Sequence, residues 1–172
     1  PGGKISQYDT PENILAAPAN DFVADFIGSG SALKQLNLRR ADELELADQA
    51  TARIGESTTE ALARLREAGE KMVVIVDDKG HPRDWIFARQ LERYETIPEP
   101  QFELNSVVDA RSTLSDAMSA MLASSHSGAL VTRRGEFVGV LYYETVTDYI
   151  QQMNAAAQEA LDDQEVDSGG EI

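Results

Sequence analysis

The stretch KMVVIVDDKGHPRDWIF, residues 71–87, decides the fold of this chain. After the first lysine, a run of methionine, valine and isoleucine favours a buried β-strand, because β-branched side chains fit a pleated surface. The polar residues 77–80 are typical of a hairpin turn, and the apolar residues 85–87 predict the returning strand. The stretch therefore predicts a β-hairpin.

Helices are predicted on both sides of this hairpin. Ser57 and Thr58 are favourable helix-starting residues, and Leu62 and Leu65 then fall on one side of the predicted helix. A second helix is predicted after the hairpin and extends through Leu91. Together these elements predict a unit of strand, helix, strand, strand and helix that begins near residue 50.

The same order of elements recurs about 55 residues further along the chain. Ser112 and Thr113 begin a predicted helix with Met118 and Met121 inward. Then follow a strand at 129–131, a turn at 133–136, a strand at 138–141, and a closing helix with Val146 and Ile150. One unit alone buries too little apolar surface, and two units packed together share a core. The predicted fold class is α+β, with a small sheet and two helices on one face in each repeat.

The flanking segments have simpler expected structures. Residues 1–28 predict a small terminal subdomain: a strand at 4–8, a helix that starts at Thr10 and Pro11 and stops at Pro18, and a second helix capped by Asn20 or Asp21. A flexible hinge at 28–31 and a charged, helical connector at 32–49 follow. Alanines at 155–157 extend the last helix, and residues 154–172, with six acids and no lysine or arginine, predict an acidic flexible tail.

Composition excludes several classes of function. The formal net charge is −15, so the surface repels nucleic acid and anionic lipid. Cysteine is absent, which excludes disulfides and thiolate metal sites, and the two histidines are not spaced as a metal pair. No run of residues approaches the roughly 20 apolar positions of a membrane-spanning helix. Because the chain starts at Pro1 without methionine or a signal peptide, we expect a segment of a larger cytoplasmic polypeptide.

The sequence also lacks motifs for catalysis. No GxxxxGK[ST] phosphate-binding loop occurs, and no spacing of serine, histidine and acidic residues implies a nucleophilic site. We therefore expect no enzyme activity in this chain itself.

The repeat over about residues 50–153 resembles a tandem pair of CBS domains, the Bateman module. The opening segment, GKISQYDTPENI at 3–14 with PANDFV at 18–23 and FIG at 26–28, resembles the end of an ABC-transporter nucleotide-binding domain. An ABC ATPase that carries two CBS domains at its C-terminus resembles the ATP-binding subunit of glycine betaine, carnitine, choline or proline importers.

The resemblance implies an organisation and a set of partners. It divides the chain into the end of an ATPase domain (1–28), a linker (29–49), CBS repeat one (50–98), CBS repeat two (102–153) and the tail (154–172). It implies homodimers through the CBS domains and contact with permease subunits through the ATPase domain. It also implies a cytoplasmic location at the inner face of the membrane, without direct insertion.

The same resemblance implies where adenosine ligands are bound in CBS domains. A threonine or serine follows the second hairpin strand, and an aspartate three residues later holds the ribose. In this chain these positions are Phe87 and Gln90 in repeat one, and Tyr142 and Thr145 in repeat two. Because neither repeat has the ribose-binding pair, we expect weak or no binding of AMP and ATP.

Further candidate ligand contacts fall near the same strands. The resemblance places cyclic di-AMP at the dimer interface, where Val140, Tyr142 and Tyr143 would line it. Tyr143 stands where the family usually has a basic residue. The alternative is that these residues form a plain dimer contact without a ligand. The loop of His126, Ser127 and Gly128, and Lys71 at the matching place in repeat one, are candidates for touching phosphate. The alternatives are that His126 is an ordinary surface-loop histidine and that Lys71 is a lysine at a strand end whose ammonium group reaches solvent. Arg133 and Arg134 are expected to be a solvated pair.

Two functional hypotheses follow. In the first, the module senses a nucleotide, cyclic di-AMP before adenine mononucleotides, and controls an importer. In the second, it is a dimerisation and ionic-strength module without a small ligand.

Overall fold

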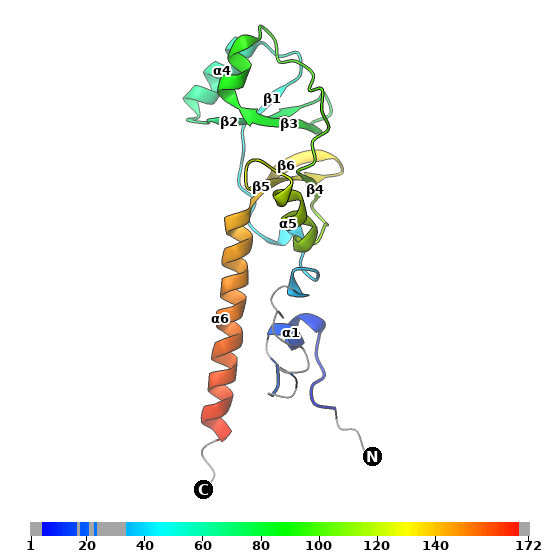
Figure 1. Ribbon diagram of the computed structural model, residues 1–172, viewed down its shortest axis with the longest axis vertical. Helices are drawn as coiled ribbons and strands as arrows, with labels where there is room; N and C mark the ends of the chain where they lie inside the picture. Colours follow the sequence, from blue (N-terminus) through cyan, green and yellow to red (C-terminus); the bar gives the residue numbers. More distant parts are fainter. Residues whose placement is uncertain (1–4, 17, 21–22, 24–33, 169–172) are drawn as a thin grey trace.

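The computed structural model describes residues 5–16, 18–20, 23 and 34–168. Two small sheets lie one above the other, each with its own helices, and a long helix runs away from them beside the N-terminal segment (Figure 1). The order of elements is the one that the sequence predicts for a duplicated unit.

The first repeat forms a three-stranded sheet in which β1 is parallel to β2, and β3 returns antiparallel to β2. A helix joins the parallel pair, as a parallel connection requires. In chain order, the elements are β1 (Thr51–Arg53), α4 (Thr58–Glu67), β2 (Met72–Val76), β3 (Pro82–Phe87) and the 3-10 helix η2 (Ala88–Arg93). The helix predicted to run through Leu91 is thus a 3-10 helix.

The second repeat has the same strand order and the same directions. In chain order, its elements are β4 (Val107–Asp109), α5 (Leu114–Leu122), β5 (Gly128–Arg133), β6 (Glu136–Tyr142) and α6 (Tyr143–Ser168). The mixed α+β class and the strand–helix–strand–strand–helix unit are therefore confirmed.

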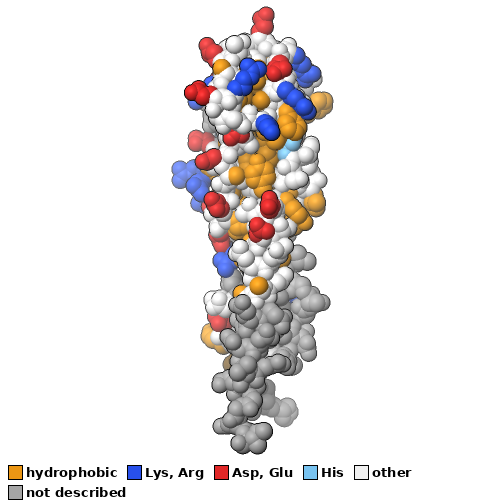
Figure 2. Space-filling view, turned by 90° about the vertical axis from the view of Figure 1, so that its left-hand side faces the viewer, with side chains coloured by type: hydrophobic (Ala, Val, Ile, Leu, Met, Phe, Trp, Pro, Cys, Tyr) orange, Lys and Arg blue, Asp and Glu red, His pale blue; other side chains and the backbone are white. Residues whose placement is uncertain are grey.

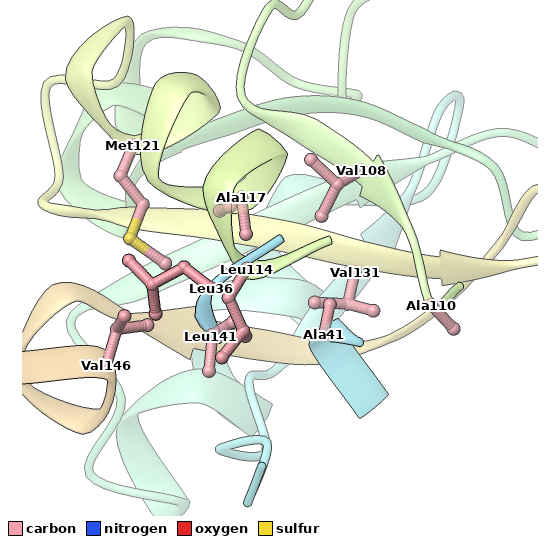
Figure 3. Close-up of a cluster of buried hydrophobic side chains, with 11 residues drawn as sticks. Leu36, Ala41, Val108, Ala110, Leu114, Ala117, Met121, Val131, Leu141 and Val146 are labelled. Atoms are coloured by element: carbon pink, nitrogen blue, oxygen red, sulfur yellow. The ribbon is translucent and has the colours of Figure 1, made fainter. Parts of the chain in front are cut away.

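Apolar side chains form one core under each sheet and a third between the sheets. Val74, Val76, Trp85, Leu130 and Val140 are buried between the two repeats, which makes the pair one packing unit. Figure 3 shows the core of the second repeat, where Met121, Leu114 and Ala117 of α5 face β5, β6 and the start of α6. Each repeat thus buries one sheet face under its helices and the other against its neighbour.

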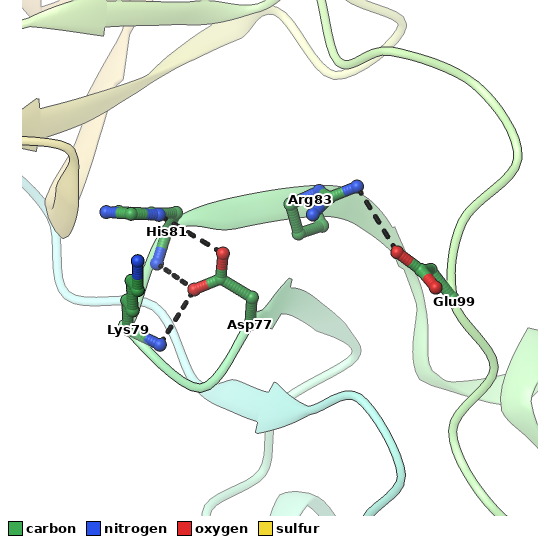
Figure 4. A network of polar contacts seen from close by, with 5 residues as sticks. All are labelled: Asp77, Lys79, His81, Arg83 and Glu99. Carbon is green, nitrogen blue, oxygen red and sulfur yellow. Dashed lines mark hydrogen bonds and ion pairs between the residues drawn. The ribbon is translucent and has the colours of Figure 1, made fainter.

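The hairpin of the first repeat is held by Asp77. One carboxylate oxygen accepts the N–H groups of Lys79 and His81, both at 2.9 Å, and the other lies 3.1 Å from His81 Nδ1 (Figure 4). The hydrogen bond from the His81 N–H is the main reason that the pKa of Asp77 is lowered. The ring of His81 in turn lies beside Gly135, so the two hairpins meet at one end of the sheets.

The connector differs from its predicted helix. Of its described residues, only Lys34 and Gln35 are α-helical, and η1 (Ala41–Glu43) is a single 3-10 turn. Residues 36–39 form turns and a bend, and the later part of the connector pairs with the second repeat: Ala47 exchanges hydrogen bonds of 2.8 and 2.9 Å with Val140. Local propensity here yields to tertiary pairing.

The close approach of this connector to β6 explains the glycine at position 139. A Cβ at this position would lie 2.9 Å from the Cβ of Leu46 and 3.2 Å from the carbonyl oxygen of Ala47. Only glycine lets the connector lie this close to β6.

At the N-terminal end, α1 (Pro11–Ala16) begins after Thr10 as predicted. The strand predicted at 4–8 is wrong for residues 5–8, which form no strand, and Tyr8 is 94% exposed. The second predicted helix lies mostly outside the described residues, although the Asn20 side chain accepts the N–H of Val23 at 3.0 Å, as a helix cap does.

At the C-terminal end, α6 continues through Ser168, so the flexible tail expected from residue 154 is helical this far. Alanine, glutamine and glutamate favour a helix, and no glycine or proline occurs between Tyr143 and Ser168. Part of α6 lies beside α1.

Candidate functional site

The candidate ligand residues converge where the strands β3 and β6 end, beside the starts of β2 and β5. Trp85, only 2% exposed, lies at the centre. The imidazole of His126 packs edge-on against Trp85 at 4.8 Å and against Phe87 at 5.7 Å between ring centroids. Its Nε2 lies 2.8 Å from the carbonyl oxygen of Trp85, which can only accept and therefore fixes the proton on Nε2.

Gly128 is needed because aromatic and apolar groups crowd its position. A Cβ there would lie 3.0 Å from the Trp85 ring and 3.2 Å from both Tyr142 and Val140. Val140 itself is fully buried, so it supports the site from beneath and does not line an open surface. In this structure the close approach at Gly128 is used by the protein's own side chains.

Tyr142 extends the cluster toward the first repeat. Its hydroxyl lies 3.5 Å from Gln49 Oε1, and the Gln49 amide donates to Glu70 at 3.1 Å and to the Met72 carbonyl at 2.9 Å. Burial raises the pKa of Tyr142, and the negative charge of Glu70 raises it further. Glu70 therefore places a negative charge at this corner.

Other candidate residues have structural roles. The Gln90 side chain accepts the N–H of Phe87 at 2.9 Å and so caps η2. The N–H of Tyr143 donates to the carbonyl of Ser127 at 2.9 Å, with Ser127 in a left-handed conformation at φ 54°. Thr145 is half-buried in the first turn of α6.

Lys71 is exposed and stands apart from the aromatic cluster. With Phe87 it borders a pocket of about 310 Å³ whose apolar walls include Leu62, Leu65 and Ala88. The guanidinium of Arg89 lies over the Phe87 ring at 5.0 Å, within cation–π range. The candidates thus divide into an inner aromatic cluster and an outer pocket with cations at its rim.

The face that carries both groups is apolar and partly exposed. Phe87 is 39% exposed and Tyr143 is 45% exposed. Figure 2 shows hydrophobic side chains gathered along the middle of one face, with a histidine beside them. Such a surface can stack a planar ring or pack against another protein.

Three residues of the site are absent from the sequence-based candidates: Trp85, Gln49 and Glu70. Glu70 stands two residues before β2, as His126 stands two residues before β5, so the repeat itself contained the signal. Trp85 is the single tryptophan of the chain, and its position in an apolar strand pattern indicates core packing only.

The fold of this chain is similar to that of solved CBS-domain proteins. A CBS-domain protein of unknown function from Bacillus anthracis superposes with a TM-score of 0.55 at 14% identity, covering 70% of this chain and 98% of that one. Staphylococcus aureus OpuCA gives a TM-score of 0.51 at 14% identity, covering 62% and 96%. The chain has the fold of a CBS domain pair. No protein-family model matches the sequence.

Sequence relatives of this CBS pair are transporter subunits. The osmoprotectant import ATP-binding protein OsmV of Salmonella typhimurium is 26% identical over 151 residues, which is 86% of this chain and 40% of OsmV. The glycine betaine/carnitine/choline transport ATP-binding protein OpuCA of Bacillus subtilis is 24% identical over 53% of this chain and 24% of its own length. The CBS pair therefore spans less than half of these relatives. No helix among its described residues is long and apolar enough to cross a membrane.

Proposed function

We propose that this chain is the regulatory CBS module of the ATP-binding subunit of an osmoprotectant importer, and that it controls transport without catalysing a reaction itself. The observation that carries the proposal is a CBS-pair fold in a chain whose relatives are named as ATP-binding proteins of osmoprotectant import. The absence of a GxxxxGK[ST] loop from the sequence supports a regulatory role. The module would act at the inner face of the cell membrane, as part of the assembled transporter.

Two copies would associate through the apolar face that carries Phe87 and Tyr143. Both aromatic rings are more than a third exposed, and aromatic residues are enriched where proteins meet. Pairing of two modules would bring two ATPase domains, and through them the permease subunits, into a fixed relation. Any signal that favours one arrangement of the pair would then change transport.

The signal proposed first is a nucleotide, with cyclic di-AMP ahead of adenine mononucleotides. Neither Phe87 nor Tyr142 is followed three residues later by a carboxylate, so the ribose of a mononucleotide lacks its usual partner. Aromatic rings favour stacking on a base, which is worth about 1–3 kcal/mol for each base. Lys71, Arg66 and Arg89 border the outer pocket and supply positive charge for phosphate, against the carboxylates of Glu70 and Glu92.

A second candidate is an ionic-strength module without a ligand. It is favoured by the satisfied polar groups of the site, since His126 Nε2 and the Gln90 side chain already bond within the chain. A net charge of −15 also makes association between two copies sensitive to salt.

Sedimentation and calorimetry of the 172-residue chain test the proposal. We expect a dimer at about 100 µM, and cyclic di-AMP affinity tighter than about 10 µM, near −7 kcal/mol. Tyr143→Ala should weaken cyclic di-AMP by about 1–3 kcal/mol through lost stacking. Tyr94→Ala, which removes an aromatic ring exposed to a similar degree elsewhere in repeat one, is the matched control.

The outcomes separate the two candidates. A dimer that ignores nucleotides but dissociates as salt changes would support the ionic-strength module. A monomer at this concentration, with no nucleotide bound, would contradict both.

A further inference from the structure

Three arginines gather at the opposite ends of β5 and β6 from the aromatic cluster. Arg133 and Arg134 lie at the hairpin between these strands, and Arg111 follows β4. We propose that Arg111, Arg133 and Arg134 form an anion site that binds a phosphate group. The site is separate from the face assigned above to dimer contact and nucleotide binding.

The three side chains share one pocket. Its volume is about 390 Å³, and its lining residues are Asp42, Asp109, Ala110, Arg111, Arg133 and Arg134. These come from three separate segments of the sequence: the connector, the end of β4 with the two residues that follow it, and the hairpin between β5 and β6. The volume lies within the range of small-ligand pockets, about 300–1,000 Å³.

The charges in this pocket are only partly neutralised. Arg133 forms an ion pair with Asp42 at 3.1 Å. No described carboxylate lies within ion-pair distance of Arg111 or Arg134. Asp109, the second acid of the lining, uses one carboxylate oxygen to accept the backbone N–H of Arg111 at 2.9 Å. Two guanidinium groups therefore stay available for an anion, in a chain with twice as many acids as bases.

The backbone conformation of Arg134 also supports the anion site. Its φ is 57°, and that of Gly135 is 87°, so both residues of the turn are left-handed. Asparagine and glycine are preferred at such positions, whereas an arginine there costs about 1–2 kcal/mol. An unfavourable residue held at a strained position suggests a function for its side chain.

Phosphate fits the geometry of these side chains. A guanidinium presents parallel N–H donors that match two phosphate oxygens, and several arginines around one pocket can share the negative charge. A carboxylate or chloride offers less charge for the same donors.

An anion bound at the site would change the contacts between the connector and repeat two. Asp42 belongs to η1 of the connector and competes with a bound anion for Arg133. Arg40 of the connector also donates to the carbonyl of Arg111 at 2.9 Å. An anion in the pocket therefore bears directly on the contacts that hold the connector against repeat two.

Calorimetry of the 172-residue chain with inorganic phosphate and with pyrophosphate tests the site, with sodium chloride keeping ionic strength constant. We expect pyrophosphate to bind more tightly than phosphate. Arg111→Ala and Arg134→Ala should each weaken pyrophosphate by about tenfold or more, as expected for loss of a charged hydrogen bond. Arg93→Ala is the control, because it removes the same charge beside Tyr94, away from both the outer pocket and the arginine pocket. Equal weakening in this control, or no binding by the wild type, would overturn the proposal.

Arg134→Gly separates binding from folding. Glycine accepts a φ of 57° without strain, so this variant should melt at or above the temperature of the wild type. It should nevertheless lose pyrophosphate affinity like Arg134→Ala, and a variant that keeps full affinity would contradict the site. These measurements do not depend on nucleotide sensing or on dimerisation.

Discussion

The two repeats have the same topology but are built from different side chains at matched positions. Where the central strand of repeat one places Val74 opposite Trp85, that of repeat two places Leu130 opposite Val140. All four residues meet in the core between the sheets. A large ring from one repeat is thus accommodated by smaller groups from the other, and the pair is complementary although the topology is duplicated.

The loops that begin the first helix of each repeat also differ. In repeat two, Thr113 and Asp116 form a reciprocal capping box. In repeat one, the Ser57 side chain makes no such bond, and an ion pair of 2.6 Å between Arg64 and Glu56 closes the loop instead. The same helix start is therefore stabilised by a local cap in one repeat and by a charge pair in the other.

The largest expected difference lies at the core between the sheets. Trp85→Ala should destabilise the fold by about 3–5 kcal/mol, because it removes a ring that contacts both repeats. Val140→Ala at the matched position removes only two methyl groups and should cost about 2 kcal/mol. Urea denaturation of both variants measures the difference. Equal losses of stability in the two variants would contradict this packing, because they would mean that Trp85 and Val140 contribute equally to the core between the sheets.

The sequence predicts the repeat units well because their signal is local. Runs such as residues 72–76 consist of apolar, mostly β-branched residues, which by themselves predict a buried strand. The predicted strands therefore coincide with β2 and overlap β5. The connector was predicted wrongly because its partner is distant: the pairing of Ala47 with Val140 is not visible in the residues near Ala47.

The candidate site was predicted only in part, for a related reason. Phe87, His126, Gly128 and Tyr142 were found as repeat-matched positions, and the structure brings them together. Trp85 was missed because a tryptophan in a strand is indistinguishable from ordinary core. The ligand role of all the candidates stays a prediction.

The second comparison concerns the position opposite the central strand, where repeat two has Gly139 and repeat one has Asp84. Gly139→Ala should destabilise the fold by about 1–3 kcal/mol, because its Cβ would meet Leu46 at 2.9 Å. Asp84→Ala should have a smaller effect, since Asp84 already carries a Cβ. Thermal and urea unfolding of both variants check this. A neutral Gly139→Ala would show that the connector can move away at little cost.

The third comparison uses the two helix starts. Thr113→Ala should cost about 1 kcal/mol, because it removes the side chain that accepts the N–H of Asp116. Ser57→Ala should cost a few tenths of a kcal/mol at most, since Ser57 makes no side-chain cap bond. Urea denaturation of both variants gives the two values, and the reverse order would contradict the assignment of caps.

The smallest expected effect is the pH dependence of the ion pair in repeat one. Burial alone would raise the pKa of Glu56, but hydrogen bonds from Arg64 and from the Arg53 N–H outweigh it and lower the pKa below its usual 4.5. A carboxylate with a lowered pKa stabilises the fold above its usual pKa and loses this contribution as pH falls through the lowered value. Because the Arg64 side chain is 53% exposed, the pair is worth only about 0.2–1 kcal/mol.

Arg64→Ala should therefore raise the pKa of Glu56, measured by NMR titration of its carboxyl carbon, and should destabilise the fold near pH 7 more than at pH 3. Repeat two has Ser112 and Ala120 at the matched positions, so its loop contributes no such charge pair. Arg66→Ala is the control, because Arg66 pairs with Glu92 at 3.5 Å with both side chains mostly exposed. If the two arginine variants show the same pH profile, the loop of repeat one does not depend on this charge pair. Its helix start must then be held by backbone bonds, in which the Ser57 carbonyl accepts from Ala61 and the Thr58 N–H donates to Glu95.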